Sequence, residues 1–218
     1  MLKGVIFDMD GLMIDTEKLL TRFWCEAANH YGYPMTKEHV LGIRSLAAKY
    51  AIPNLKGIFG EDFDYYKVRG KRIELMNEFI RQNGIEKKKG LDELLDYLDS
   101  TGLKKAVATA TDLQRTTLYL SSINIIDRFD KLICGNMIEN GKPAPDIYLA
   151  AAKELELDPS ECIALEDSPN GIRSAHTAGC KPVMIPDLSQ PDEETKKLLY
   201  ACCDDLSNVI GVIQKLLR

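Results

Sequence analysis

Two acids separated by one residue close the first apolar run of the chain. Val5, Ile6 and Phe7 are contiguous β-branched or aromatic residues, a pattern typical of a strand buried on both faces. Asp8 and Asp10 follow at once and can point to the same side, because side chains in extended chain repeat every two residues. Buried carboxylates are costly unless a cation or hydrogen-bond donors compensate them. The pair predicts a cation-dependent site at the strand tip, with an acid that merely caps the loop as the structural alternative.

Further polar side chains follow three later apolar runs, at 106–108, 132–134 and 162–165. They are a threonine, a lysine in a Gly-Lys-Pro-Ala-Pro loop and two adjacent acids: Thr109, Lys142, Glu166 and Asp167. In open parallel sheets the ligand binds at the carboxyl ends of the strands. We therefore expect these residues to share one crevice with Asp8 and Asp10.

The predicted crevice crowds four carboxylates: Asp8, Asp10, Glu166 and Asp167. Carboxylates this close repel one another unless a cation lies among them. Oxygen ligands without histidine or cysteine favour a hard ion, Mg²⁺ before Ca²⁺ or Zn²⁺. Mg²⁺ commonly binds one or two carboxylates together with a substrate phosphate. The sequence thus predicts Mg²⁺ as cofactor and a small phosphorylated metabolite as substrate.

Other residues of this set suit phosphate chemistry. Thr109 offers a hydroxyl donor and Lys142 a positive charge, and helices predicted after Thr111 and Ser168 offer unpaired N–H groups. Hydrolysis of phosphate monoesters is so slow in water that enzymes accelerate it by up to about 10²¹-fold. A carboxylate nucleophile divides the reaction into two easier steps. We expect Asp8 to be that nucleophile, and Asp10 to be the general acid and base.

The predicted elements place these groups together. Strand-like runs alternate with helical ones after residue 84, which predicts an α/β fold with a parallel sheet covered by helices on both faces. Five strands are expected, near 5–7, 106–108, 132–134, 162–165 and 182–185, and the tail from 191 is expected to be mainly helical. Residues 16–83 contain no convincing strand, although 52–62 has no clear pattern. We expect a catalytic core of residues 1–15 and 84–218, with an all-helical cap of residues 16–83 inserted.

Composition narrows the choice of partner. The formal net charge of −5 argues against nucleic acid or an anionic membrane surface as a partner, so an anionic substrate would need locally placed cations. The six cysteines form no CxxC pair, and two of them lie in strand-like runs, which predicts reduced thiols. No charged leader or membrane-length apolar run is evident. We expect a cytoplasmic, monomeric protein.

Four segments resemble, in order and spacing, the signature motifs of the haloacid dehalogenase-like superfamily. They are Asp8-Met9-Asp10-Gly11, Thr109, residues 142–146 and residues 165–171. The resemblance is greatest to its branch of β-phosphoglucomutases and phosphoglycolate phosphatases and spans essentially the whole chain. It implies a Rossmann-like core with a helical cap, and the second acid argues against a true dehalogenase.

The resemblance also implies a role for each matched residue. Asp8 would be the nucleophile and Asp10 the acid and base, while Mg²⁺ would be held by Asp8, Asp167 and the Asp10 backbone carbonyl. Glu166 is assigned to the metal site as well, either as a ligand through water or as a residue that only orients other groups. The phosphate contacts would be Thr109, Ala110 and Lys142.

Two departures from the branch favour a phosphatase over a sugar phosphomutase. Mutases carry Lys-Asn shortly after the second motif, where this chain has Asp112 and Leu113, and their cap arginine follows a Gly-hydrophobic-Ser step. Here the order is Gly-Ile-Arg-Ser at 42–45, so Arg44 is out of register. Arg44 is a predicted substrate contact or else an exposed helix cation, Asp112 a helix-start acid or a leaving-group contact, and Trp24 a core residue rather than a substrate platform. A phosphomutase and a non-catalytic binding protein remain the alternatives.

Overall fold

The central strand of the fold is the one that carries the acid pair. The computed structural model describes residues 1–44 and 46–218, and in it β1 (Gly4–Phe7) lies inside a six-stranded sheet of order β3-β2-β1-β4-β5-β6. All neighbouring strands are parallel. The other strands are β2 (Lys104–Thr109), β3 (Lys131–Cys134), β4 (Cys162–Glu166), β5 (Lys181–Met184) and β6 (Ala201–Cys202). The predicted α/β class and the five predicted strands are confirmed.

The tail from residue 191 is mainly helical, as predicted, but it also contains a sixth strand that was not predicted. β6 has two residues and lies on β5, where the Tyr200 N–H donates to the Pro182 carbonyl at 2.8 Å and the Cys203 N–H to the Met184 carbonyl at 2.9 Å. A strand this short has no alternation of apolar and polar residues that a sequence could reveal.

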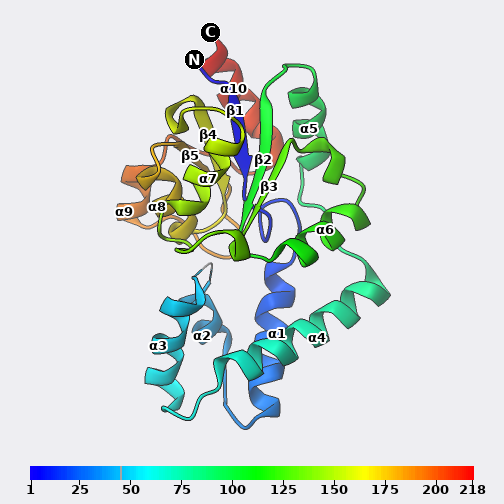
Figure 1. The fold of residues 1–218 in the computed structure, drawn as a ribbon, viewed down its shortest axis with the longest axis vertical. Coiled ribbons are helices and arrows are strands. Elements are labelled where there is room, and N and C mark those ends of the chain that lie inside the picture. The colour runs from blue at the N-terminus through cyan, green and yellow to red at the C-terminus, as the bar shows by residue number, and fades with distance from the viewer. Residues whose placement is uncertain (45) are drawn as a thin grey trace.

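Helices cover both faces of the sheet, as Figure 1 shows. Alternate residues of β1 face opposite ways: Val5 and Phe7 belong to one buried apolar cluster and Ile6 to another. The first cluster includes residues of α5 (Leu91–Asp99), α6 (Leu113–Ser122) and α10 (Val209–Leu217); the second includes residues of α7 (Asp146–Glu154) and α8 (Pro169–Thr177). The short α9 (Glu193–Leu198) packs against α8. β1 is therefore buried on both sides, as its composition predicts.

Four further helices lie beyond the carboxyl ends of the strands (Figure 1). They are α1 (Glu17–His30), α2 (Lys37–Gly42), α3 (Ala48–Phe59) and α4 (Tyr65–Asn83), and they share a buried apolar cluster of their own. α3 occupies most of the segment left without a prediction. Pro53 inside the helix hides the helical pattern in the sequence, although Ala51 and Leu55 pack into the cluster. The all-helical character of the insert agrees with the sequence, and the division into core and cap stays a prediction.

The composition predicts reduced cysteines and no membrane-length apolar run. All six cysteines are free thiols, and Cys134 and Cys162 are buried in strands, as predicted. Within residues 1–44 and 46–218, no helix has both the length and the apolar character that crossing a bilayer requires.

Candidate active site

The register of the central strands sets the position of Asp8. Phe7 pairs with Val107 of β2 and Leu165 of β4, so Asp8 lies level with the ends of both neighbours, and its N–H donates to the Leu165 carbonyl at 3.0 Å. Because side chains alternate along a strand, Asp8 faces the same side as Ile6, the side that α7 covers. The loop before α7 carries Lys142, so the topology brings the acid and the lysine together.

Lys142 lies at the centre of a buried hydrogen-bond network. Its Nζ donates to Asp8 Oδ1 at 2.5 Å, to Glu166 Oε1 at 2.6 Å and to the Ala108 carbonyl at 3.1 Å, which uses all three donors of an ammonium group. Burial opposes its charge, but the two carboxylates outweigh burial and raise the pKa of Lys142 above its ordinary value. Lys142 is therefore a fixed positive charge beside Asp8. Burial in turn raises the pKa of Asp8 well above its ordinary range, although Lys142 opposes the shift.

Glu166 has its oxygens occupied by protein donors. Its Oε1 also accepts from the Tyr148 hydroxyl at 2.6 Å, and its Oε2 accepts from the Ser168 hydroxyl at 3.2 Å. Ser168 in turn caps α8, since its Oγ accepts the Gly171 N–H at 3.1 Å. Of the two roles predicted for Glu166, these contacts favour orienting Lys142. Sequence reasoning missed Tyr148, for which the only signal is that a buried phenol needs a hydrogen-bond partner.

Arg44 reaches from the end of α2 to the acids of the sheet. Its guanidinium pairs with Asp167 Oδ2 through Nη2 and lies 3.2 Å from Glu17 Oε2 through Nε. With a side chain only 4% exposed, Arg44 is not an exposed helix cation, and that alternative is wrong. Ser45, the next residue of the predicted step, lies outside the described residues. Burial raises the pKa of Glu17 to about 8, although Arg44 opposes the shift.

The acids form a cluster that suits a divalent cation. One oxygen from each of Asp8, Glu166 and Asp167 lies within 4.8 Å of the others. Asp167 is buried, and its Oδ1 has no hydrogen-bond partner among the described residues. An unpaired buried carboxylate oxygen beside two other acids is what a bound hard cation would compensate. The residues present therefore fit a divalent metal ion.

Gly11 has no side chain, and the Asp167 carboxylate occupies the space that a Cβ at Gly11 would fill. Its φ is +84°, and a Cβ there would lie 2.1 Å from Asp167 Oδ2. We expect Gly11→Ala to lower the unfolding free energy by about 2–4 kcal/mol, since the left-handed backbone alone costs about 1–2 kcal/mol and the clash adds to it. Urea unfolding measures the loss. The control is Gly32→Ala, where φ is +83° and no atom lies within 4 Å of an added Cβ, so equal losses in both variants would contradict the clash.

Asp10 is held by two threonine hydroxyls. Its Oδ1 accepts from Thr16 Oγ1 at 2.6 Å and its Oδ2 from Thr111 Oγ1 at 2.7 Å. Thr16 is the N-cap residue of α1, but its hydroxyl donates to Asp10 instead of capping the helix. Thr109, also buried, accepts the Thr111 N–H through its own hydroxyl at 3.1 Å. The sequence predicts that Thr109 and Asp10 lie at the same site. It does not predict that Thr16 and Thr111 orient Asp10.

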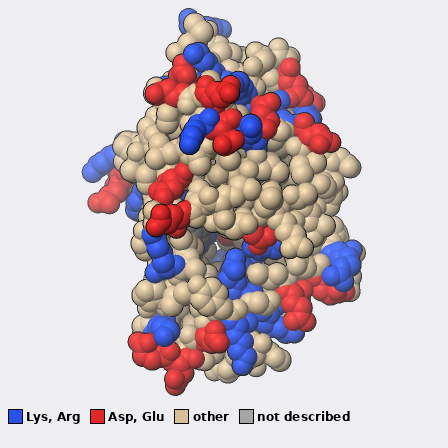
Figure 2. All heavy atoms as spheres, viewed as in Figure 1, with Lys and Arg blue, Asp and Glu red and all other residues tan. Residues whose placement is uncertain are grey.

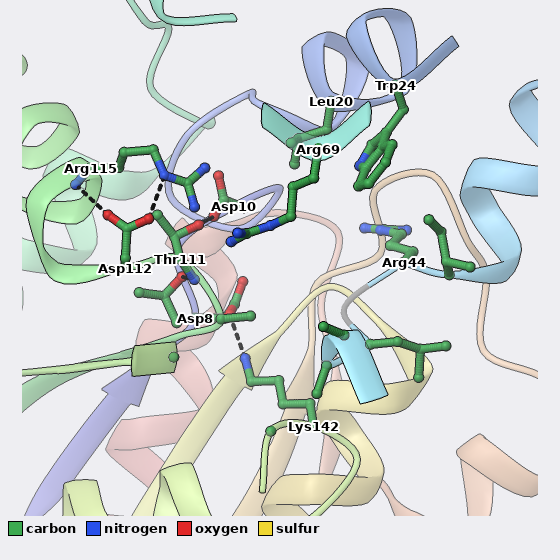
Figure 3. A pocket seen from close by; sticks show the side chains of 18 of the residues that line it. Asp8, Asp10, Leu20, Trp24, Arg44, Arg69, Thr111, Asp112, Arg115 and Lys142 are labelled. Atoms are coloured by element: carbon green, nitrogen blue, oxygen red, sulfur yellow. Dashed lines mark hydrogen bonds and ion pairs between the residues drawn. The ribbon is translucent and has the colours of Figure 1, made fainter. Parts of the chain in front are cut away.

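A cavity of about 410 Å³ lies between the carboxyl ends of the strands, called the rim below, and the helices α1 to α4. Figure 2 shows the hollow on the surface. Figure 3 shows its lining from close by. Six of the predicted site residues line it: Asp8, Asp10, Arg44, Thr109, Ala110 and Lys142. Glu166 and Asp167 lie behind them, fully buried. Trp24 lines the cavity and also belongs to the apolar cluster of the helices, so the predicted core position holds.

Asp112 has a structural partner. It is the N-cap of α6, where its Oδ1 accepts the Arg115 N–H at 3.0 Å and its Oδ2 accepts from Arg115 Nε at 2.8 Å. These contacts favour the helix-start role predicted for Asp112.

Comparisons with known proteins show the family of the chain. A family model described as "Haloacid dehalogenase-like hydrolase" matches residues 5–185. The chain is 29% identical to "Phosphorylated carbohydrates phosphatase" of Thermotoga maritima, over 84% of each chain. It is 32% identical to "Probable pseudouridine-5'-phosphatase" of Drosophila melanogaster, over 87% of this chain and 84% of the relative. In fold it is similar to a hydrolase from Pseudomonas syringae, with a TM-score of 0.86 at 21% identity over 98% of each chain. The chain belongs to the haloacid dehalogenase-like hydrolases.

Proposed function

We propose that the protein is a Mg²⁺-dependent phosphatase that hydrolyses a small phosphorylated metabolite, a sugar phosphate or similar, through an aspartyl phosphate on Asp8. The observation that carries the proposal is the convergence of Asp8, Asp10, Thr109 and Lys142 with an acidic cluster at one wall of the cavity. The relatives named as phosphatases of phosphorylated carbohydrates and of pseudouridine 5'-phosphate support the reaction class.

The proposed chemistry has two displacements at phosphorus. Lys142 bonds Asp8 through Oδ1, so Oδ2 is the oxygen that attacks. The ester P–O bond breaks as Asp10 gives a proton to the leaving oxygen. Water then attacks phosphorus while Asp10 takes a proton back, which releases phosphate and restores the Asp8 carboxylate. Thr109 and the Ala110 N–H would bind phosphoryl oxygens.

Asp8, Asp167 and the Asp10 carbonyl would hold Mg²⁺, with Glu166 fixing Lys142 beside them. The ion would supply positive charge that offsets the phosphoryl oxygens and lets an anion approach the acids. The family's general use of divalent metals and the acidic cluster support this assignment.

A panel of phosphate esters tests the function. Purified protein with Mg²⁺ should release inorganic phosphate from at least one sugar phosphate or nucleotide-like ester, and EDTA should stop the release. Asp8→Asn serves as the blank for contaminating phosphatases. An isomerised ester with little free phosphate would instead indicate a phosphomutase, and no turnover of any ester would indicate a binding protein.

Thr16 should be a positioning residue for Asp10. We expect Thr16→Val to lower kcat by about tenfold, because a hydrogen bond to a charged group contributes about 1.5–3 kcal/mol. The start of α1 should be unaffected, since the Thr16 side chain does not cap it. Steady-state kinetics on the best ester of the panel measures the effect. Thr195→Val is the control, because Thr195 is buried away from the cavity and its hydroxyl has no partner among the described residues; equal losses in both variants would refute the role of Thr16.

A further inference from the structure

Arg44 links the helices beyond the sheet to an acid of the rim. Its Nη2 donates to Asp167 Oδ2, its Nη1 donates to Ser189 Oγ at 3.3 Å, and its Nε lies 3.2 Å from Glu17 Oε2. The Arg44 side chain is 4% exposed, and the Asp167 side chain is fully buried. The three partners come from the end of β4, the chain after β5 and the start of α1. Contacts from three elements therefore hold the guanidinium beside Asp167.

The backbone around Arg44 also contacts the sheet side of the cavity. The Arg44 carbonyl accepts from Asn170 Nδ2 at 3.0 Å, and Asn170 lies near the start of α8, shortly after Asp167. The Ala47 N–H donates to the Lys142 carbonyl at 3.3 Å. The backbone as well as the side chain therefore sets the position of Arg44 relative to Asp167.

The two oxygens of Asp167 differ in their surroundings. Oδ2 pairs with Arg44 and lies where a Cβ of Gly11 would come within 2.1 Å of it. Oδ1 is buried and has no hydrogen-bond partner among the described residues, so a cation is the partner that would compensate it. Both oxygens belong to one rigid carboxylate, so a bond that fixes Oδ2 also fixes the direction of Oδ1.

We infer that Arg44 is a positioning residue for the metal site, which binds Asp167 Oδ2 and thereby directs Oδ1 toward the cation. The inference rests on the proposed metal site at Asp8 and Asp167. Residues that bind the other atoms of a metal ligand fix the orientation of that ligand. The helices in this way complete a site whose ligands come from the sheet, and Arg44 acts on a metal ligand and not on the substrate.

The affinity of the metal-free protein for Mn²⁺, a hard ion that accepts the same oxygen ligands as Mg²⁺, tests the inference without any ester. The electron paramagnetic resonance of free Mn²⁺ measures it. We expect Arg44→Met to raise the Kd about ten- to hundredfold, the usual effect of removing a residue that orients a metal ligand. If Arg44 contributed only its charge, the variant would lower the Kd, because a guanidinium repels a cation. An unchanged or lower Kd would therefore overturn the inference.

Lys49→Met is the matched control. Lys49 lies in the first turn of α3, and its Nζ donates to Asn140 Oδ1, so it joins the same helices to the sheet side without contacting an acid of the rim. This exposed contact should contribute little, and the Kd for Mn²⁺ should stay that of wild type. A Kd raised as much as in Arg44→Met would show that docking of the helices, and not the orientation of Asp167, is the cause.

A second variant covers the case in which Arg44→Met does not fold, since that change leaves Asp167 buried without its cation. Arg44→Lys keeps the charge, but one ammonium on a shorter side chain cannot reproduce the contacts of the guanidinium with Asp167, Glu17 and Ser189. The Kd for Mn²⁺ should again rise. A Kd equal to that of wild type would overturn the inference here too.

Steady-state kinetics separates the positioning role from a contact with the substrate. The turnover lost in Arg44→Met should return as the Mg²⁺ concentration is raised, while the KM for the ester at saturating Mg²⁺ stays that of wild type. A KM that remains raised at every Mg²⁺ concentration would show that Arg44 binds the substrate, and would refute the positioning role.

The wild-type protein separates this inference from the proposed function. If it binds Mn²⁺ but hydrolyses no ester of the panel, the phosphatase proposal fails, and the comparison of Kd values still tests Arg44. If it hydrolyses an ester and Arg44→Met binds Mn²⁺ as tightly as wild type, only the inference fails. A wild-type protein that binds no Mn²⁺ would refute the metal site and the role of Arg44 together.

Discussion

The variant Asp8→Asn should lower kcat by at least about 10⁴-fold, the largest effect expected of any single change. The amide has the shape of the carboxylate but does not form the aspartyl phosphate on which both displacements depend. Release of inorganic phosphate from the best substrate, with saturating Mg²⁺, measures the loss.

The stability of the same variant shows whether the loss is chemical. Burial raises the pKa of Asp8 above its ordinary range, so the charged carboxylate destabilises the folded metal-free protein at neutral pH, and this cost disappears as the pH falls below the ordinary range. The metal-free Asp8→Asn protein should therefore have a thermal midpoint no lower than wild type at neutral pH. Retained turnover would contradict the nucleophile, and a collapsed midpoint would show that the fold was lost instead.

The variant Lys142→Met should lower the unfolding free energy by about 3–5 kcal/mol, because it leaves two buried carboxylates without their cation. Both partners are within 2.6 Å of Nζ, and neither is more than 8% exposed. Turnover should fall as well, since Lys142 offsets the charge of both Asp8 and the approaching phosphate. Urea unfolding in EDTA measures the stability and excludes any contribution from a bound metal.

A double-mutant cycle identifies the cause of this loss. Adding Glu166→Gln to Lys142→Met should restore at least about 1 kcal/mol, because one uncompensated charge is removed. Lys131→Met is the matched control: its pair with Glu154 is exposed, so the change should stay within about 0.5 kcal/mol. If Lys142→Met were as stable as this control, the buried network of Lys142, Asp8 and Glu166 would not stabilise the fold.

Most of the candidate site was predictable because its residues follow buried strands. Asp8, Thr109 and Asp167 directly follow or end apolar runs, and a parallel sheet necessarily brings such positions to one edge. Lys142 and Arg44 were predicted from their loops, but their partners were not. An ion pair such as Arg44 with Asp167 joins residues far apart in the chain, so it depends on packing that no local pattern encodes.

The residues that sequence reasoning missed have side chains with an ordinary local explanation. Thr16 looks like a helix cap and Tyr148 like an apolar residue of α7, yet each donates a hydrogen bond to an acid of the site, Thr16 to Asp10 and Tyr148 to Glu166. In the sequence, Arg72 looks like one of several cations on α4. Only its burial distinguishes it from the others. In the fold, β6 and the part of α3 from residue 52 onward escaped prediction, because β6 is two residues long and Pro53 lies inside α3.

The stereochemical course at phosphorus tests the central claim most directly. Hydrolysis of a phosphorothioate ester made chiral with two oxygen isotopes, in water labelled with the third, gives a product thiophosphate whose configuration can be determined. Transfer to Asp8 followed by transfer to water inverts the configuration twice, so the prediction is net retention. Net inversion would mean that water attacks the ester directly, and would contradict a covalent role for Asp8.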